Sequence, residues 1–389
     1  MNTKVFSAFA LLALTLLSCG KKPVYEDVIP LVASVVADTA DQRFNDIAAY
    51  DTLGRMGSIA VVGPVEETIE LTEYLLSCDV YDNATGKAQA DMLPDFAGET
   101  FDAVLDVLNL EYPQNELQLR ELAVRNALFA ISSQSCLNPY DVQMTHQKNK
   151  SKIIVLSSSL VSGFGYEDII SLFRKFGQGV RLISPIHSMV QCLLSESEST
   201  SIVLGVWADN DIISSGVYTN VLHPMVTDEH VALSQYVNYA VNVYDTALSA
   251  LVGFLDTYLS LGNTRPLDAI LVDGTVGIPV DELNNALEAV MNCAEDYMIK
   301  YNGILKPDFR FIDANTSIAR CCYKMMRDEN NFTHRIAYPT VESYLIMPLV
   351  ESSEQDLPFR FVNFNQRYLP ISVRDFMSQY TLKMSEALL

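Results

Sequence analysis

The chain is short of basic residues and of several common motifs, and each shortage excludes a class of function. Lys and Arg number 26 against 48 acidic residues, which gives a net charge of −22. A chain with this charge repels a phosphate backbone, so we expect no nucleic-acid partner. The glycines form neither GxGxxG nor a P-loop, and the histidines form no HExxH. We therefore expect no nucleotide cofactor and no metal.

Cysteine is scarce and scattered. Seven occur in 389 residues, and they form no CxxC zinc motif or compact disulfide framework. Six of them lie beyond the first 20 residues: Cys78, Cys136, Cys192, Cys293, Cys321 and Cys322. We expect these six to be buried thiols with at most one or two disulfides.

Long hydrophobic runs are absent except at the start of the chain. Residues 1–22, "MNTKVFSAFALLALTLLSCGKK", begin with Lys4 and continue with the apolar run Val5–Leu17, a pattern typical of an export signal. The run is too short to span a membrane as a mature helix. Its end, "LLSC", resembles the bacterial lipobox, which implies that residues 1–19 are a lipoprotein signal peptide and that Cys19 carries acyl chains such as palmitate. An ordinary signal peptide is the alternative.

Such a lipid would place the protein in the bacterial cell envelope, anchored to a membrane on its periplasmic or outer surface. Two or more acyl chains hold a protein stably, whereas one binds only marginally. The sequence does not indicate the membrane leaflet or the oligomeric state.

The remaining sequence alternates strands and helices. Hydrophobic residues make up 49% of the chain and aromatics 10%, enough for a packed core. Short apolar runs bounded by turn residues predict strands at 58–64, 152–159, 180–185, 201–208, 267–274 and 309–315. Amphipathic patterns predict helices at 66–77, 117–131, 166–176, 229–261 and 280–301. This alternation predicts βαβ units and largely parallel sheets.

The order of these elements predicts an α/β chain of several parts. Residues 20–55 form a tether and an N-terminal packing segment, residues 56–183 a first α/β lobe, and residues 184–314 a second lobe. In residues 315–389, two strand-like segments and a closing helix at 372–389 return to cover the first lobe.

The predicted strand in "KIIVLSSS" ends on three consecutive hydroxyls, Ser157, Ser158 and Ser159. Small polar residues in this position cap the following helix. They also stand where open α/β sheets bind ligands, beyond the carboxyl ends of the strands. Both interpretations hold at this point.

Five segments at strand ends resemble the aspartate/glutamate racemase superfamily. "ADNDIISSGVY" (208–218) is similar to the family's Ala-Thr-x-Gly-Thr-Val-x-Ser-Gly-x-Tyr, with Ser215, Gly216 and Tyr218 kept, and "FIDANTSIAR" (311–320) is similar to its late Ile-Asp-Ser-Gly segment. "IAVVGPVEE" (59–67), "IIVLSSSLVS" (153–162) and "LDAILVDGTVGIP" (267–279) stand where the family has its opening strand and its two cysteine segments. The resemblance implies two pseudo-symmetric α/β lobes with a site between them. A type I periplasmic-binding-protein architecture is the alternative.

The departures from the family fall on its chemistry. Ser157 stands in place of the first catalytic cysteine, Gly63 in place of the early aspartate, and around the second cysteine only Gly274 and Thr275 remain. A thiol can exchange a proton at an α-carbon when its pKa is lowered toward neutrality, whereas a serine hydroxyl cannot. We therefore expect no two-cysteine racemase activity.

These residues lead to three hypotheses. The first is a lipoprotein that binds a small anionic or polar metabolite between its lobes. Its expected binding residues are Ser157, Ser158, Ser159, Ser215, Tyr218 and Thr275. The second is a hydrolase or lyase that uses weaker catalytic candidates, Asp313 and His187 at strand ends and the pair Asp95 and Glu99. The third is a structural envelope lipoprotein.

The pair Asp95 and Glu99 belongs to the most distinctive polar region of the sequence, residues 81–106. If this segment is helical, Asp95, Glu99 and Asp102 share one helix face, because they are spaced at i, i+4 and i+7. Such a cluster suits a cation or acid–base chemistry. The alternative is that Asp95 caps a helix that begins near Phe96.

Overall fold

The computed structural model describes residues 28–50, 54–106, 115–136, 144–197, 199–242, 244–292, 300–301, 303–348 and 359–364. The predicted signal peptide, Cys19, Cys293 and the helix predicted at 372–389 lie outside these residues. None of the helices in the described ranges is long and apolar enough to cross a membrane.

The first lobe is built on a sheet of six strands in the order β12-β11-β2-β1-β5-β6. Every neighbouring pair is parallel except β11 with β12. The strands are β1 (Ser58–Pro64), β2 (Thr100–Asp106), β5 (Ser151–Leu156), β6 (Leu182–Ile183), β11 (Thr340–Pro348) and β12 (Phe359–Phe364). A separate ladder pairs β3 (Gln134–Ser135) with β4 (His146–Gln147).

The second lobe is built on a fully parallel sheet in the order β10-β9-β7-β8. Its strands are β7 (Ser201–Ala208), β8 (Ala232–Ala240), β9 (Leu267–Val272) and β10 (Leu305–Asp313). Strands β2-β1-β5-β6 of the first lobe and β8-β7-β9-β10 of the second repeat one order, in which the first strand in sequence lies between the second and the third. The prediction of two pseudo-symmetric α/β lobes with mostly parallel sheets is therefore confirmed.

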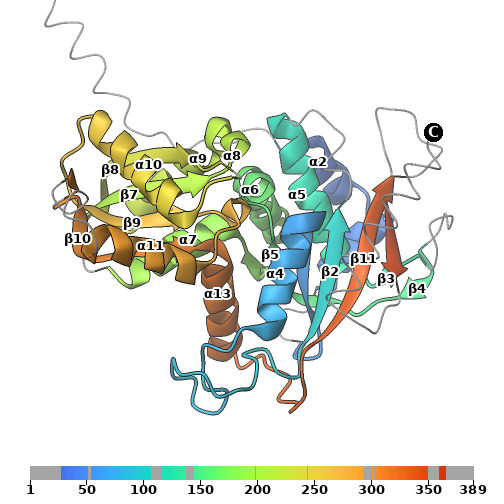
Figure 1. Cartoon of the computed structure of the whole chain (residues 1–389). Coiled ribbons are helices and arrows are strands. Elements are labelled where there is room, and N and C mark those ends of the chain that lie inside the picture. Colours follow the sequence, from blue (N-terminus) through green and yellow to red (C-terminus); the bar gives the residue numbers. More distant parts are fainter. Residues whose placement is uncertain are drawn as a thin grey trace, which may run out of the picture.

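Helices cover both faces of each sheet and fill the space between the lobes (Figure 1). The first lobe carries α2 (Pro30–Ala37), α3 (Gln42–Ala48), α4 (Val65–Ser77), α5 (Glu116–Ile131), α6 (Ser159–Lys175) and α7 (Pro185–Ser195). The second carries α8 (Asn210–Ser215), α9 (Val217–Asp228), α10 (Ala247–Ser260), the short helix η2 (Gly274–Val276) and α11 (Val280–Asn292). Helix α13 (Ala314–Asp328) leaves β10 of the second lobe and packs against α4 and α7 of the first.

Successive side chains of β1 and β5 point to opposite faces of the first sheet, as the two-residue period of a strand requires. Val62 and Ile154 point into a cluster that continues through the helices to Leu204 and Leu271 of the second sheet. Their strand neighbours point to the other face, where α4 and α13 pack. One hydrophobic core therefore joins the two lobes, and it fixes the strand ends of both sheets relative to each other.

The helix predicted for 229–261 is wrong in its first part. Residues Ala232–Ala240 form the edge strand β8, and the helix begins only at Ala247. The partly buried residues of β8 include Tyr236 and Tyr239, aromatic residues that favour strands. The Thr246 side chain then accepts a hydrogen bond from the backbone N–H of Ser249 and starts the helix there.

The helical interpretation of Asp95, Glu99 and Asp102 is also wrong. Residues 95–98 form a turn in which Gly98 has a φ of +79°, a conformation that favours glycine. Strand β2 begins two residues later, at Thr100. Asp95 therefore caps no helix at Phe96, and the three carboxylates do not share a helix face.

Candidate functional site

The carboxyl ends of the parallel strands carry residues that cap the next helix. After β5, Ser158 accepts a hydrogen bond from the Val161 N–H at 3.5 Å. After β7, β9 and β10 the caps are Asp209, Asp273 and Asp313, each of which accepts from a backbone N–H at the start of the next helix. The sequence thus places acidic caps at three strand ends, because Asp is favoured at that position.

Asp273 is the centre of a polar cluster between the lobes. Its buried carboxylate accepts hydrogen bonds from the Tyr218 hydroxyl at 2.6 Å, the Thr275 hydroxyl at 2.9 Å and the Ser159 hydroxyl. The Thr275 N–H also donates to it at 3.1 Å. Ser159 begins α6 of the first lobe, so its bond to Asp273 crosses between the lobes. Three of the predicted binding residues therefore meet on one carboxylate that the sequence analysis did not select.

Glu67, in the first turn of α4, is the second carboxylate of this region. Burial raises the pKa of Glu67 to about 8, and the charge of Asp273 adds to the rise. A hydrogen bond from Ser158 opposes the rise but does not cancel it. Among the described residues no Lys, Arg or His forms an ion pair or hydrogen bond with Glu67 or Asp273. We call Glu67, Ser158, Ser159, Tyr218, Asp273 and Thr275 the junction cluster.

The junction cluster holds two carboxylates with different chemistry. The pKa of Glu67, about 8, keeps it protonated through most of the neutral range, whereas Asp273 accepts hydrogen bonds from the Tyr218 and Thr275 hydroxyls and from the Thr275 N–H. Both can also accept hydrogen bonds from an ammonium or hydroxyl group. Glu67 and Thr275 are half-buried, so this part of the cluster reaches solvent.

Ser157, directly after β5, is bonded to residues outside the junction cluster. Its hydroxyl contacts the Thr68 hydroxyl at 2.9 Å, and its N–H donates to the Val62 carbonyl at 3.0 Å. A side chain on Gly63 would collide with the Ser157 hydroxyl, so glycine is required where the resemblance places an aspartate. The five cysteines of the described residues lie elsewhere, at the end of α4, after β3, in α7 and in α13.

Two other predicted residues, Ser215 and Asp313, have local roles. The Ser215 hydroxyl donates to the Ile212 carbonyl at 2.7 Å and accepts from the Val217 N–H, which shapes the turn between α8 and α9. Asp313 caps α13 through the Thr316 N–H at 3.0 Å. No hydrogen bond or ion pair in the described part of the chain joins either residue to the junction cluster.

His187 lies in the first turn of α7. Its Nδ1 contacts the Ser184 hydroxyl at 2.7 Å, and its ring stacks on Tyr166 with centroids 3.8 Å apart. Burial lowers the pKa of His187 to about 4, so the ring is neutral at physiological pH. The structure does not bring Ser157, His187 and Asp313 together as a hydrolytic triad.

Asp95 and Glu99 lie at the opposite edge of the first sheet, where the parallel strands begin. Asp95 accepts hydrogen bonds from the backbone N–H groups of Val80 and Tyr81. Glu99 accepts from Lys152 at 2.6 Å. Lys152 is at the start of β5 and Ser157 just after its end, about 17 Å apart at the usual rise along a strand. The two acids therefore stabilise the fold at a distance from the junction cluster.

Sequence reasoning missed Glu67, Thr68 and Asp273. The signal that selects them is position: each lies within four residues of the end of a predicted parallel strand. Asp273 also precedes a glycine, as loop-lining acids at such edges often do. These residues occupy a position relative to a strand end similar to that of Ser157, Ser158 and Ser159.

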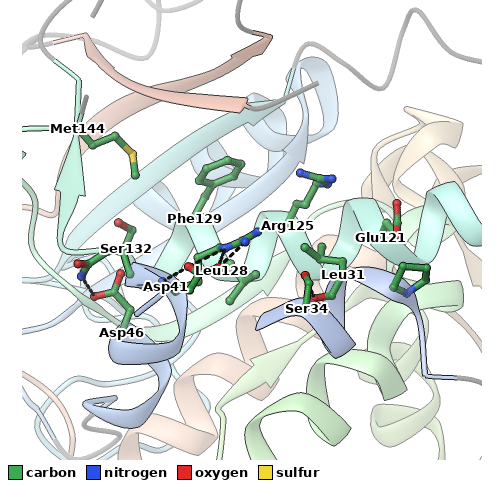
Figure 2. Close-up of a pocket in the computed structure, with 13 residues that line it drawn as sticks. Leu31, Ser34, Asp41, Asp46, Glu121, Arg125, Leu128, Phe129, Ser132 and Met144 are labelled. Atoms are coloured by element: carbon green, nitrogen blue, oxygen red, sulfur yellow. Dashed lines mark hydrogen bonds and ion pairs between the residues drawn. The ribbon is translucent and has the colours of Figure 1, made fainter. Parts of the chain in front are cut away.

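A separate cavity of about 610 Å³ lies between α2, α3 and α5 (Figure 2). Its polar side chains contact their own surroundings: Asp41 caps α3 and pairs with Arg43, and Asp46 accepts from Gln42 at 3.2 Å. The Ser34 hydroxyl donates to the Leu31 carbonyl at 2.8 Å. Asp41 in this cavity already has a cationic partner, whereas Asp273 of the junction cluster has none among the described residues. We therefore regard the junction cluster as the stronger candidate for a ligand site.

No protein-family model and no curated protein matches the chain. Among solved structures, glutamate racemase from Francisella tularensis is 14% identical with a TM-score of 0.46, covering 76% of this chain and 90% of that one. A glutamate racemase isoform from Bacillus anthracis is 12% identical with a TM-score of 0.44, covering 75% and 89%. Unliganded arylmalonate decarboxylase is 11% identical with a TM-score of 0.35, covering 72% and 97%. Values this low carry no conclusion about the reaction.

Proposed function

We propose that this protein binds a small polar metabolite at the junction cluster, and that the ligand carries an amine or several hydroxyls. The observation that supports this is the pair of carboxylates, Asp273 and Glu67, with hydroxyl partners and no cation against them. A ligand ammonium would compensate the charge of Asp273 and favour ionisation of Glu67. An anionic ligand, which the sequence left open, would place a second negative charge beside that of Asp273.

The proposed function involves no two-thiol chemistry. Ser157 stands where the resemblance places the first cysteine, and only Gly274 and Thr275 remain around the second. The Ser157 hydroxyl is bonded to Thr68 rather than to a base. A hydroxyl without a base is neither a carbon-acid catalyst nor an activated nucleophile.

Binding requires the lobes to separate at one point. The Ser159 hydroxyl of the first lobe is bonded to Asp273 of the second, so a ligand amine would replace this hydroxyl on the carboxylate. Because the exchange substitutes a charged donor for a neutral one, it strengthens the hydrogen bond to Asp273. The ligand would then bridge the two lobes.

The test uses three four-carbon probes that differ in charge: 1,4-diaminobutane, 4-aminobutyrate and succinate. We expect the diamine to raise the melting temperature most and succinate not at all. At a concentration of one hundred times Kd a ligand stabilises the native state by about 2.7 kcal/mol. Stabilisation by succinate alone would contradict the proposal.

Matched variants separate this binding from general attraction of cations to an acidic protein. Glu67→Gln and Asp273→Asn should each reduce the diamine shift, whereas Glu66→Gln, at the exposed neighbouring position, should leave it unchanged. Equal shifts in all three variants would mean that the diamine binds the acidic surface and not the junction cluster.

We further propose that Cys19 is lipidated and holds the protein at a membrane of the bacterial envelope, with the lobes outside the cytoplasm. The support is the "LLSC" ending of the N-terminal apolar run. Expression in a bacterial host should place the protein in the membrane fraction, and Cys19→Ala should release it. Membrane association that survives Cys19→Ala would contradict lipidation.

A further inference from the structure

A second cavity, of about 280 Å³, lies between α7 and α13 and contains two thiols. Cys192 and Glu196 line it from α7, and Arg320, Cys321 and Lys324 line it from α13. It is separate from the junction cluster, which lies at the strand ends. The sequence analysis treated both cysteines as inert buried thiols.

The two helices place these thiols against each other. The Cys192 Sγ lies 4.0 Å from the carbonyl oxygen of Ser317, one helical turn before Cys321. The Cys321 Sγ lies 4.0 Å from the carbonyl oxygen of Ser188, one turn before Cys192. This reciprocal packing brings the two sulfurs together in the helix interface, where the Cys321 Sγ also donates to the Gln191 side-chain oxygen at 3.5 Å.

The surroundings favour a thiolate on Cys192. The hydrogen bond from Cys321 lowers the pKa of Cys192 to about 7, and the nearby Arg320 guanidinium contributes in the same direction. The same bond raises the pKa of Cys321, because it is the donor. Arg320 is itself held by Glu196 at 2.6 Å. The thiolate is the nucleophilic form of cysteine.

The pair also has access to small reagents. Cys321 is partly exposed, and Cys192, although buried like Cys78, Cys136 and Cys322, lines the same cavity as Cys321. Burial also raises the pKa of Cys322 to about 12, which keeps it protonated. Of the five cysteines in the described residues, Cys192 and Cys321 therefore combine proximity, access and thiolate character.

We propose that Cys192 and Cys321 are a dithiol that hydrogen peroxide oxidises to a disulfide between α7 and α13. The Cys192 sulfur attacks the peroxide, so that an S–O bond forms, the O–O bond breaks and the departing hydroxide takes a proton to become water. The Cys321 sulfur then attacks the sulfenic acid on Cys192. The S–S bond forms, the S–O bond breaks, and a second water leaves with the Cys321 proton. Two thiols and one peroxide give one disulfide and two waters.

The disulfide would join parts of the chain that belong to different lobes. Helix α7 follows β6 of the first sheet, and α13 follows β10 of the second. A covalent bond between these helices restricts how far the lobes can separate. Oxidation is therefore expected to raise the melting temperature of the protein, and a reductant to reverse the change.

The experiment treats the full chain with hydrogen peroxide and maps its cysteines by non-reducing peptide mass spectrometry. We expect one cross-link between the peptide that contains Cys192 and the tryptic peptide Cys321–Lys324, with loss of two free thiols per molecule. In Cys321→Ser, the sulfenic acid on Cys192 should persist and react with dimedone. Wild-type protein suffices for the first result, so a misfolded variant does not prevent the test.

Two further variants decide the identity of the pair. The tryptic peptide contains both Cys321 and Cys322, so the cross-link must survive in Cys322→Ser and disappear in Cys321→Ser. It must also survive in Cys136→Ser, the matched change of a buried cysteine outside the pair. A wild-type protein that keeps both thiols reduced while Cys321→Ser forms the sulfenic acid would overturn the proposal, as would a cross-link that depends on Cys322.

Discussion

The amino-terminal and carboxyl edges of the parallel sheets hold their carboxylates in opposite ways. At the amino-terminal edge, Asp102 lies 2.8 Å from the Lys148 ammonium and Glu99 lies 2.6 Å from that of Lys152. At the carboxyl edge, Glu67 and Asp273 have hydroxyl and backbone partners instead. Asp102 and Glu99 each have a lysine ammonium beside them, whereas Asp273 has none among the described residues and leaves its charge for a ligand to compensate. The difference separates a structural edge from a candidate site.

The largest expected effect breaks the structural edge. Lys152→Met leaves Glu99 buried without its cation, which should lower the free energy of unfolding by about 3–5 kcal/mol. The Lys152 ammonium also donates to the carbonyls of Arg55 at 3.0 Å and Asn331 at 2.8 Å, and these bonds are lost as well. Urea denaturation measures the change.

The exposed Lys175→Met is the matched control and should have little effect. The double variant Lys152→Met with Glu99→Gln should regain part of the loss, because it removes the unpaired charge. A Lys152→Met protein as stable as the wild type would mean that the ion pair between Lys152 and Glu99 does not stabilise the amino-terminal edge.

A smaller effect is expected at the junction cluster. Tyr218→Phe removes a buried hydroxyl that donates to Asp273 at 2.6 Å, which should cost about 1.5–3 kcal/mol because the acceptor is charged. Tyr244→Phe, at a side chain that is 91% exposed, is the control. Urea denaturation of both variants measures the difference. If Tyr218→Phe is neutral, the hydroxyls around Asp273 contribute no net stability.

A further effect concerns pH and sharpens the comparison. The folded state raises the pKa of Glu67 to about 8 from an ordinary 4.5, so it binds a proton more tightly than the unfolded state does. This stability is fully present below about pH 4.5 and is lost as pH rises toward 8, with a slope of at most about 1.4 kcal/mol per pH unit. The wild type should therefore lose stability relative to Glu67→Gln across that window.

The measurement is a series of urea denaturation curves between pH 5 and pH 8, conditions set by the pKa values above. Glu66→Gln should follow the pH dependence of the wild type, since its side chain is exposed. Parallel pH profiles for the wild type and Glu67→Gln would show that Glu67 does not hold an extra proton in the folded state.

The sequence predicted the strands that position this site better than it predicted the contacts of the charged residues. Strand β1 coincides with the predicted strand at 58–64, and β7 with that at 201–208, because buried parallel strands are continuous apolar runs. Strand β2 was missed because its sequence, "TFDAVLD", carries acids at Asp102 and Asp106, which lower strand propensity. Asp102 is tolerated there because Lys148 reaches it from a segment 46 positions away in the sequence, a pairing that local patterns do not contain.

The same limit explains the candidate site. Ser157, Ser158 and Ser159 were selected because three hydroxyls follow a strand, and two of them contact the carboxylates of the junction cluster. Glu67 comes from α4 of the first lobe and Asp273 from the end of β9 in the second. Only the folded chain shows that they are near enough for the charge of Asp273 to raise the pKa of Glu67. Proximity of this kind depends on how the two lobes pack together, which brings α4 near the residues that follow β9.

The parallel pairing of β11 with β2 has a consequence for how the chain acquires its structure. Thr100 and Thr340 lie side by side, 240 positions apart in the sequence. Until residues 340–348 arrive, β2 presents an unpaired edge, which is a template for association with other chains. The second sheet draws its strands from 201–313 and needs no such late partner. Non-local pairing slows folding, so the first lobe, although it is made first, is expected to finish last.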